Sequence, residues 1–191
     1  MSEECIVFDK RPVKLESSGK YLGMYIDEKM NFSNHIEYVC SKVSRSIGIL
    51  YRIRLLVPRR VLVNLYYCLI YPYLTYCNII WGGTARIHLL KLEILQKKIV
   101  RIMTISAYLA HTDPLFNDLN IMKLKDIHNY ILCQLMYKRN IMGSLLVENH
   151  CHDTRRGSDV RPVFRRLNST QQCSEMGTRY LFNDFANFDS I

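Results

Sequence analysis

Four basic residues on one predicted helix are the clearest candidates for chemistry in this sequence. At about 100° per residue, one third of the circumference of a helix over residues 86–105 is formed by Lys91, Lys97, Lys98 and Arg101. A different third is apolar and consists of Leu92, Leu95, Ile99, Ile102 and Met103. We therefore expect one side of this helix to pack on a core and the other to form a ridge of positive charge. Such a ridge binds the phosphates of nucleic acids without reading bases.

The charge of the whole chain supports this interpretation. The 191 residues carry a net charge of +9, and residues 40–110 hold eleven basic residues against one acidic residue, Glu93. Arg59 and Arg60 belong to this stretch and are further candidates for phosphate contacts. A cluster of positive charges attracts polyanions, whereas ordinary protein surfaces mix positive and negative charges. The alternative is a basic, solvated helical surface that binds no partner.

A second candidate site is formed by Tyr21, Leu22 and Gly23. Residues 21–26, YLGMYI, are typical of a β-strand, and a strand would place Tyr21 and Tyr25 on one face. A glycine inside a strand marks a bulge or the close approach of another backbone. Exposed aromatic side chains stack on nucleic-acid bases. The alternative is an ordinary edge strand that happens to contain tyrosine.

Residue patterns of catalysis are missing from the sequence. It contains no GxxxxGK[ST] or GxGxxG phosphate loop and no GxSxG nucleophile elbow. His35 and Cys40 are five residues apart on a predicted helix and share no face, so a nucleophile–base pair is not expected. The His150-Cys151-His152 cluster does not match zinc-site spacing, even with Cys173 as a fourth ligand. We expect no catalytic residue, metal site or cofactor in this chain.

The elements that position these residues are predicted to be mainly helical. We expect a short β-hairpin within residues 1–32, with strands at residues 5–8 and 21–26, a helical bundle over 33–147, and a loosely ordered, Arg-rich tail over 148–191. Asn34 and Glu37 have capping-box spacing at the start of the first helix. Its apolar stripe consists of Ile36, Val39, Val43, Ile47 and Leu50.

The uncharged run over residues 61–81 has two interpretations. Pro58 suits the start of a helix, and Pro72 should end that helix near Tyr71 and begin a third one that reaches about Ile80. Twenty-one uncharged residues could also span a bilayer, but Pro72 and five tyrosines disfavour a span. We expect buried helices and no membrane contact. Seven scattered cysteines and an acidic N-terminus favour an intracellular protein, nuclear or cytoplasmic.

Several short blocks occur in the same order as in one known family. They are Lys20-Tyr21-Leu22-Gly23 with Asp27 and His35-Ile36, then Leu65-Tyr66, residues 69–74 (LIYPYL), Tyr76 and Trp81, then residues 95–98 (LQKK) with Arg101-Ile102, and residues 110–116 (AHTDPLF). Residues 152–155 and 177–185 resemble a weaker final block, in which Leu181 or Phe182 replaces a tryptophan and a proline is absent. The chain thus resembles the part that follows the catalytic palm in jockey-like non-LTR retrotransposon reverse transcriptases.

The resemblance implies a role for each region. The hairpin around Tyr21 would hold the primer end, and the helices from residue 33 onward would form a thumb-like bundle that grips a primer–template duplex, RNA–DNA or DNA. The family's Mg²⁺-binding aspartates, including an [FY]ADD motif, precede the Tyr-Leu-Gly block, and only about twenty residues precede it here. We therefore expect a C-terminal portion that binds nucleic acid without catalysis and whose partners are the missing palm and fingers. The alternatives are a non-functional relic or a small membrane-associated protein.

Overall fold

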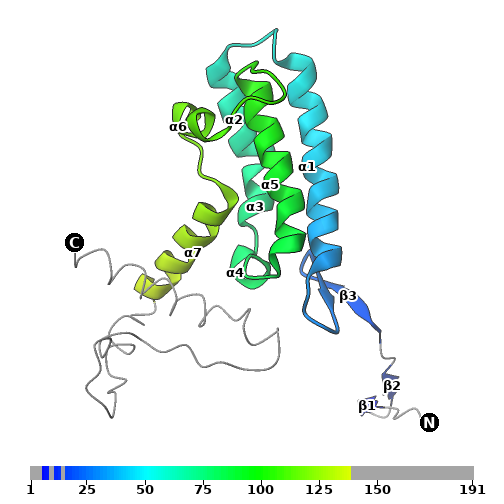
Figure 1. Cartoon of the computed structure of the whole chain (residues 1–191). Coiled ribbons are helices and arrows are strands. Elements are labelled where there is room, and N and C mark those ends of the chain that lie inside the picture. Colours follow the sequence, from blue (N-terminus) through cyan, green and yellow to red (C-terminus); the bar gives the residue numbers. More distant parts are fainter. Residues whose placement is uncertain (1–5, 9–10, 14–15, 139–191) are drawn as a thin grey trace, which may run out of the picture.

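The computed structural model describes residues 6–8, 11–13 and 16–138 of the chain (Figure 1). The elements in order are β1 (Ile6–Phe8), β2 (Arg11–Val13), β3 (Ser18–Tyr21), β4 (Met24–Asp27), α1 (Ser33–Ile53), α2 (Arg59–Leu69), α3 (Tyr71–Thr75), α4 (Asn78–Trp81), α5 (Arg86–Met103), α6 (Asp113–Leu119) and α7 (Leu124–Lys138). The prediction of a mainly helical fold with an N-terminal hairpin is confirmed. The Arg-rich tail over 148–191 and its His150–His152 cluster lie outside the described residues.

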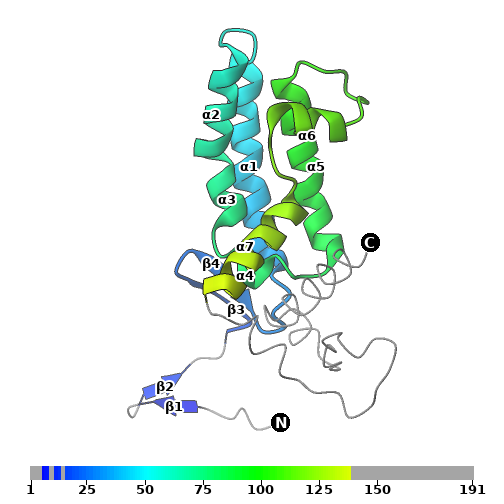
Figure 2. The same ribbon diagram turned by 90° about the vertical axis from the view of Figure 1, so that its left-hand side faces the viewer.

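The long helices α1 and α5 lie side by side and form the centre of the helical body, as Figures 1 and 2 show. The five stripe residues predicted for α1 are all buried, because their spacing keeps them on one face. The inner face of α5 is buried as predicted at Leu92, Ile99, Ile102 and Met103, while Leu95 is half-buried. The periodicity of apolar residues therefore located the core correctly.

The start of α1 differs from the predicted capping box. The helix begins at Ser33, and the residue before it, Phe32, has a positive φ of 54° and makes no side-chain cap. Phe32 is 3% exposed, and its carbonyl accepts the first helical hydrogen bond from the Ile36 N–H at 2.9 Å. Burial of an aromatic ring fixes the entry of the chain into α1, and so the Asn34–Glu37 cap was a wrong prediction.

Residues 61–81 form parts of three helices instead of two. The break before Pro72 is confirmed, since α2 ends at Leu69 and α3 carries Pro72 in its first turn. The expected helix from Pro72 to Ile80 is interrupted at Cys77, which has a φ of 50°. The Tyr76 carbonyl near this interruption accepts a hydrogen bond from Trp81 Nε1 at 2.8 Å.

Five large side chains of the uncharged run lie in the core, whereas Tyr67, Tyr76 and Ile80 are exposed. Leu62, Tyr66, Ile70, Leu74 and Trp81 are each at most 1% exposed. Within residues 16–138, none of the helices is both long enough and apolar enough to cross a bilayer.

The N-terminal strands form two hairpins, where one was predicted. β1 pairs with β2, and β3 pairs with β4, both antiparallel. The predicted strand over 21–26 is instead folded back on itself, because Leu22 and Gly23 have φ values of 46° and 84° and form a two-residue turn. Tyr21 pairs with Met24 and Tyr25 pairs with Lys20, so the two tyrosines project from opposite faces of the hairpin and not from one face.

Candidate nucleic-acid interface

The outer side of α5 carries the four predicted basic residues. Lys91, Lys97 and Lys98 are exposed, and Arg101 is half-buried. Lys91 Nζ lies 2.9 Å from Glu37 Oε1 on α1, and this pairing raises the pKa of Lys91 and lowers that of Glu37. Arg101 Nε donates a hydrogen bond to the Ala110 carbonyl at 3.0 Å. Lys97 and Lys98 form no ion pair with any of the described residues. Lys97 nevertheless lies near Asp113, whose pKa is lowered mainly by Lys123 and also by the charge of Lys97.

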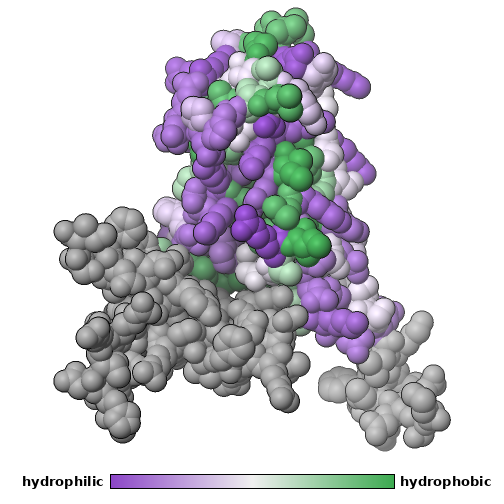
Figure 3. Space-filling view, viewed as in Figure 1, coloured by the Kyte–Doolittle hydropathy of each residue, from purple (hydrophilic) through white to green (hydrophobic). Residues whose placement is uncertain are grey.

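Apolar side chains interrupt this basic face. Ile87, Leu90 and Ile94 are 71%, 39% and 63% exposed and fall in the same third of the helical circumference as the basic residues. Apolar patches are visible between polar side chains on the face of the molecule where α5 lies (Figure 3). The expected ridge of positive charge is thus interrupted by apolar side chains, and the face is mixed. The purely basic part is its C-terminal half, with Lys97, Lys98 and Arg101.

Arg59 and Arg60 lie at the start of α2, and Arg59 is ion-paired with Asp118 of α6. Arg60 is exposed and has no ion-pair partner within residues 16–138. Both arginines lie at the end of the body away from the β3–β4 hairpin, where α5 also ends (Figure 1). The structure therefore gathers Arg60, Lys97 and Lys98 toward one end of the helical body.

The β3–β4 turn lies at the opposite end of the body (Figures 1 and 2). Tyr21 and Leu22 are 66% and 73% exposed, and Gly23 is exposed as well. The Tyr76 hydroxyl donates a hydrogen bond to the Leu22 carbonyl, and the Tyr25 N–H donates to His35 Nδ1 at 3.4 Å. These contacts from α1 and the α3–α4 connection hold the turn in place while its side chains face outward. The predicted site residues thus form two separate groups.

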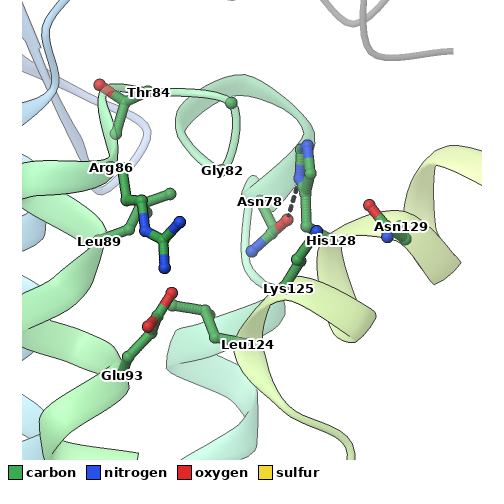
Figure 4. Close-up of a pocket in the computed structure, with 11 residues that line it drawn as sticks. Asn78, Gly82, Thr84, Arg86, Leu89, Glu93, Leu124, Lys125, His128 and Asn129 are labelled. Atoms are coloured by element: carbon green, nitrogen blue, oxygen red, sulfur yellow. Dashed lines mark hydrogen bonds between the residues drawn. The ribbon is translucent and has the colours of Figure 1, made fainter. Parts of the chain in front are cut away.

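A cavity of about 420 Å³, with several polar side chains in its lining, lies between α4, α5 and α7 and had no signal in the sequence (Figure 4). His128 Nδ1 lies 2.8 Å from Oδ1 of the buried Asn78, and burial lowers the pKa of His128. A Cβ at Gly82 would lie 2.4 Å from His128 Nδ1, which explains the glycine. In Figure 4 the Arg86 guanidinium points toward the Glu93 carboxylate. The contact between His128 and Asn78 joins α7 to α4.

Across residues 16–138, no three His, Cys, Asp or Glu side chains are close enough together to hold a metal ion. The described residues therefore do not fit the Mg²⁺ of a polymerase palm.

Known proteins that resemble this chain are polymerases of mobile elements. Over 140 residues it is 31% identical to the RNA-directed DNA polymerase from mobile element jockey of Drosophila melanogaster, a match that covers 69% of this chain and 15% of that protein. The chain is related to the jockey-like non-LTR reverse transcriptases. It is also 22% identical over 126 residues to the probable RNA-directed DNA polymerase from transposon X-element of the same species, which covers 63% of this chain and 14% of that protein.

No family model and no solved structure matches the chain. The relation to jockey-like polymerases confirms the family that the ordered sequence blocks indicated. Because the chain spans only about a seventh of either relative, the relation leaves the part played by its own residues to be argued from their geometry.

Proposed function

We propose that this chain supplies the primer-binding hairpin and the thumb of a jockey-like RNA-directed DNA polymerase, and that it holds a primer–template duplex through its phosphates. The observation that carries the proposal is the pair of unpartnered, exposed ammonium groups at Lys97 and Lys98 on a helix whose other face is buried. A rigid helix that presents positive charge fixes the position of a duplex without reading its sequence.

The dimensions of the body support a grip on one duplex at two places. α1 has 21 residues and α5 has 18, and at about 1.5 Å per residue they are roughly 30 Å and 27 Å long. One helical turn of duplex DNA is about 34 Å. A duplex lying along the body would therefore reach both the β3–β4 turn and the basic end of α5 within about one turn.

Catalysis is assigned to other parts of the polymerase. The described residues offer no cluster of carboxylates for a metal ion, and two-metal phosphoryl chemistry requires one. We accordingly assign Mg²⁺ to the palm, which together with the fingers would be the partner of this chain. On its own the chain binds duplex and does not extend a primer.

A titration of a labelled RNA–DNA hybrid tests the proposal. We expect affinity to fall steeply between 50 and 200 mM salt, because bound phosphates release counterions. The double variant Lys97→Ala/Lys98→Ala should bind more weakly and reduce the slope of log K against log salt by roughly 1.5 to 2. Lys125→Ala/Lys138→Ala, which removes two exposed lysines from α7, is the matched control. Salt-independent binding, or equal effects of the two double variants, would contradict the proposal.

A further inference from the structure

A second cavity lies directly beneath the β3–β4 turn. It has a volume of about 290 Å³ and is lined mainly by Gly23, His35, Tyr38, Pro72, Tyr73 and Tyr76. These residues come from the turn, from the first turns of α1, and from α3 and the residue after it. The cavity therefore adjoins the exposed residues Tyr21 and Leu22 but is distinct from them.

The walls of this cavity are aromatic and accessible. Tyr38 and Tyr73 are half-buried, and Tyr76 is 50% exposed. Flat aromatic rings that remain open to solvent form stacking surfaces for flat ligands, and each stacked base contributes about 1–3 kcal/mol in single-strand binding proteins. The volume and the ring lining suit a single nucleobase.

His35 lines this cavity and carries a buried hydrogen-bond donor that none of the described residues accepts. Its ring is 2% exposed, and Nδ1 accepts the Tyr25 N–H at 3.4 Å, so the neutral ring carries its proton on Nε2. His35 Nε2 is buried and has no hydrogen-bond partner among the residues that the structure describes. Burial lowers the pKa of His35, which keeps the ring neutral near pH 7. A buried donor without a partner is costly, and native proteins rarely leave one unpaired unless a ligand or water uses it.

Positive charge adjoins the same aromatic wall. Lys20 Nζ lies 5.5 Å and Lys42 Nζ lies 5.3 Å from the centre of the Tyr38 ring. Neither lysine forms an ion pair within residues 16–138. An aromatic wall, an internal donor and two nearby ammonium groups together match the base, the base acceptor and the phosphate of a nucleotide.

We propose that this cavity binds one unpaired base of the nucleic acid held at the hairpin turn. The base stacks on the tyrosine rings and accepts a hydrogen bond from His35 Nε2, while its phosphate lies near Lys20 and Lys42. Each of the four bases carries at least one suitable acceptor, so the site tolerates any sequence. This inference rests on the proposed function, since it assigns a second contact to the same hairpin.

A mononucleotide titration tests the cavity separately from duplex binding. With the ¹⁵N-labelled full chain and adenosine monophosphate up to 20 mM, we expect saturable shifts at the Gly23, Tyr38 and Tyr73 amides. His35→Asn keeps an acceptor near Nδ1 for the Tyr25 N–H but removes the Nε2 donor, and should weaken the nucleotide at least five-fold. His111→Asn changes an exposed histidine and is the control. If His35→Asn fails to fold, Tyr73→Leu provides the same test through the loss of stacking.

The outcomes separate the two proposals. If 20 mM nucleotide causes no shifts in the wild-type chain, the cavity assignment is overturned. It is also overturned if p-cresol, which mimics a tyrosine side chain, causes shifts and the nucleotide does not, because an aromatic side chain would then be the occupant. Loss of salt-dependent duplex binding, with the nucleotide shifts intact, overturns the duplex grip alone.

In a bound RNA–DNA hybrid with a single-stranded overhang, the fluorescence of 2-aminopurine in the overhang should be quenched by the wild-type chain and less by His35→Asn. Equal quenching by both proteins would count against the His35 hydrogen bond.

Discussion

The β3–β4 hairpin and the outer face of α5 present exposed residues in two different ways. The turn that carries Tyr21 and Leu22 is held by two hydrogen bonds, one between Tyr76 and the Leu22 carbonyl, 54 residues apart, and one between the Tyr25 N–H and His35. Lys97 and Lys98 are presented by the helix that carries them, and that helix is held by its own opposite face. The hairpin site therefore depends on tertiary contacts, whereas the α5 site needs only a helix with one buried face.

The largest effect is expected from Ile99→Ala on the inner face of α5. Ile99 is fully buried, and removal of its side chain should lower the free energy of unfolding by about 2–5 kcal/mol through lost burial and a cavity. Ile94→Ala on the same helix is the control, because Ile94 is 63% exposed and its loss should cost little. Urea denaturation followed by circular dichroism measures both. Similar losses for the two variants would show that the outer face of α5 is packed.

A smaller loss is expected from Gly23→Ala in the hairpin turn. Gly23 has a φ of 84°, which an alanine adopts at a cost of about 1–2 kcal/mol. The nearest atoms to a Cβ there, on Tyr76, lie 3.8 Å away, so the cost comes from the backbone and not from a clash. Gly19→Ala is the matched control, since its Cβ would meet nothing within 4 Å and its φ is not positive. A Gly23→Ala protein as stable as Gly19→Ala would mean that the turn is not fixed.

The sequence predicted the surface of α5 better than it predicted the hairpin turn. The buried stripe of α1 and the basic positions of α5 repeat with the period of a helix, so the sequence alone was sufficient to find them. The turn at Leu22-Gly23 was missed, because apolar and aromatic residues there favour a strand, and only the register of β3 with β4 reveals a turn. The unpaired Nε2 of His35 could not be predicted either, because it depends on which groups surround the ring in three dimensions.

Acid should lower the stability of the fold through two histidines, His35 and His128. Burial lowers the pKa values of His35 and His128 below the ordinary value of 6.5, whereas the unfolded chain protonates both near 6.5. Between 6.5 and the lowered values the unfolded state binds more protons, and so stability falls as the pH falls through this window.

Thermal unfolding at pH 7.5, 6.5 and 5.5 measures this dependence. The wild-type chain should lose stability from pH 6.5 to 5.5. His35→Asn should start lower and lose less over the same interval, because one of the two titrating groups is gone. His111→Asn, at an exposed position, should follow the wild type. A wild-type-like decrease in His35→Asn would mean that His35 titrates alike in the folded and unfolded chain.

The smallest effect on stability is expected for Lys91→Ala on the outer face of α5. Lys91 pairs with Glu37, but both side chains are more than half exposed, and exposed pairs contribute little because solvent and salt screen them. The melting temperature should change less in Lys91→Ala than in Gly23→Ala.

Lys91→Ala should also weaken binding of the RNA–DNA hybrid less than Lys98→Ala does. Glu37 already neutralises Lys91, while Lys98 has no ion-pair partner in the described part of the chain. If Lys91→Ala weakens binding as much as Lys98→Ala, the ion pair opens when nucleic acid binds, and the basic surface extends over the whole length of α5.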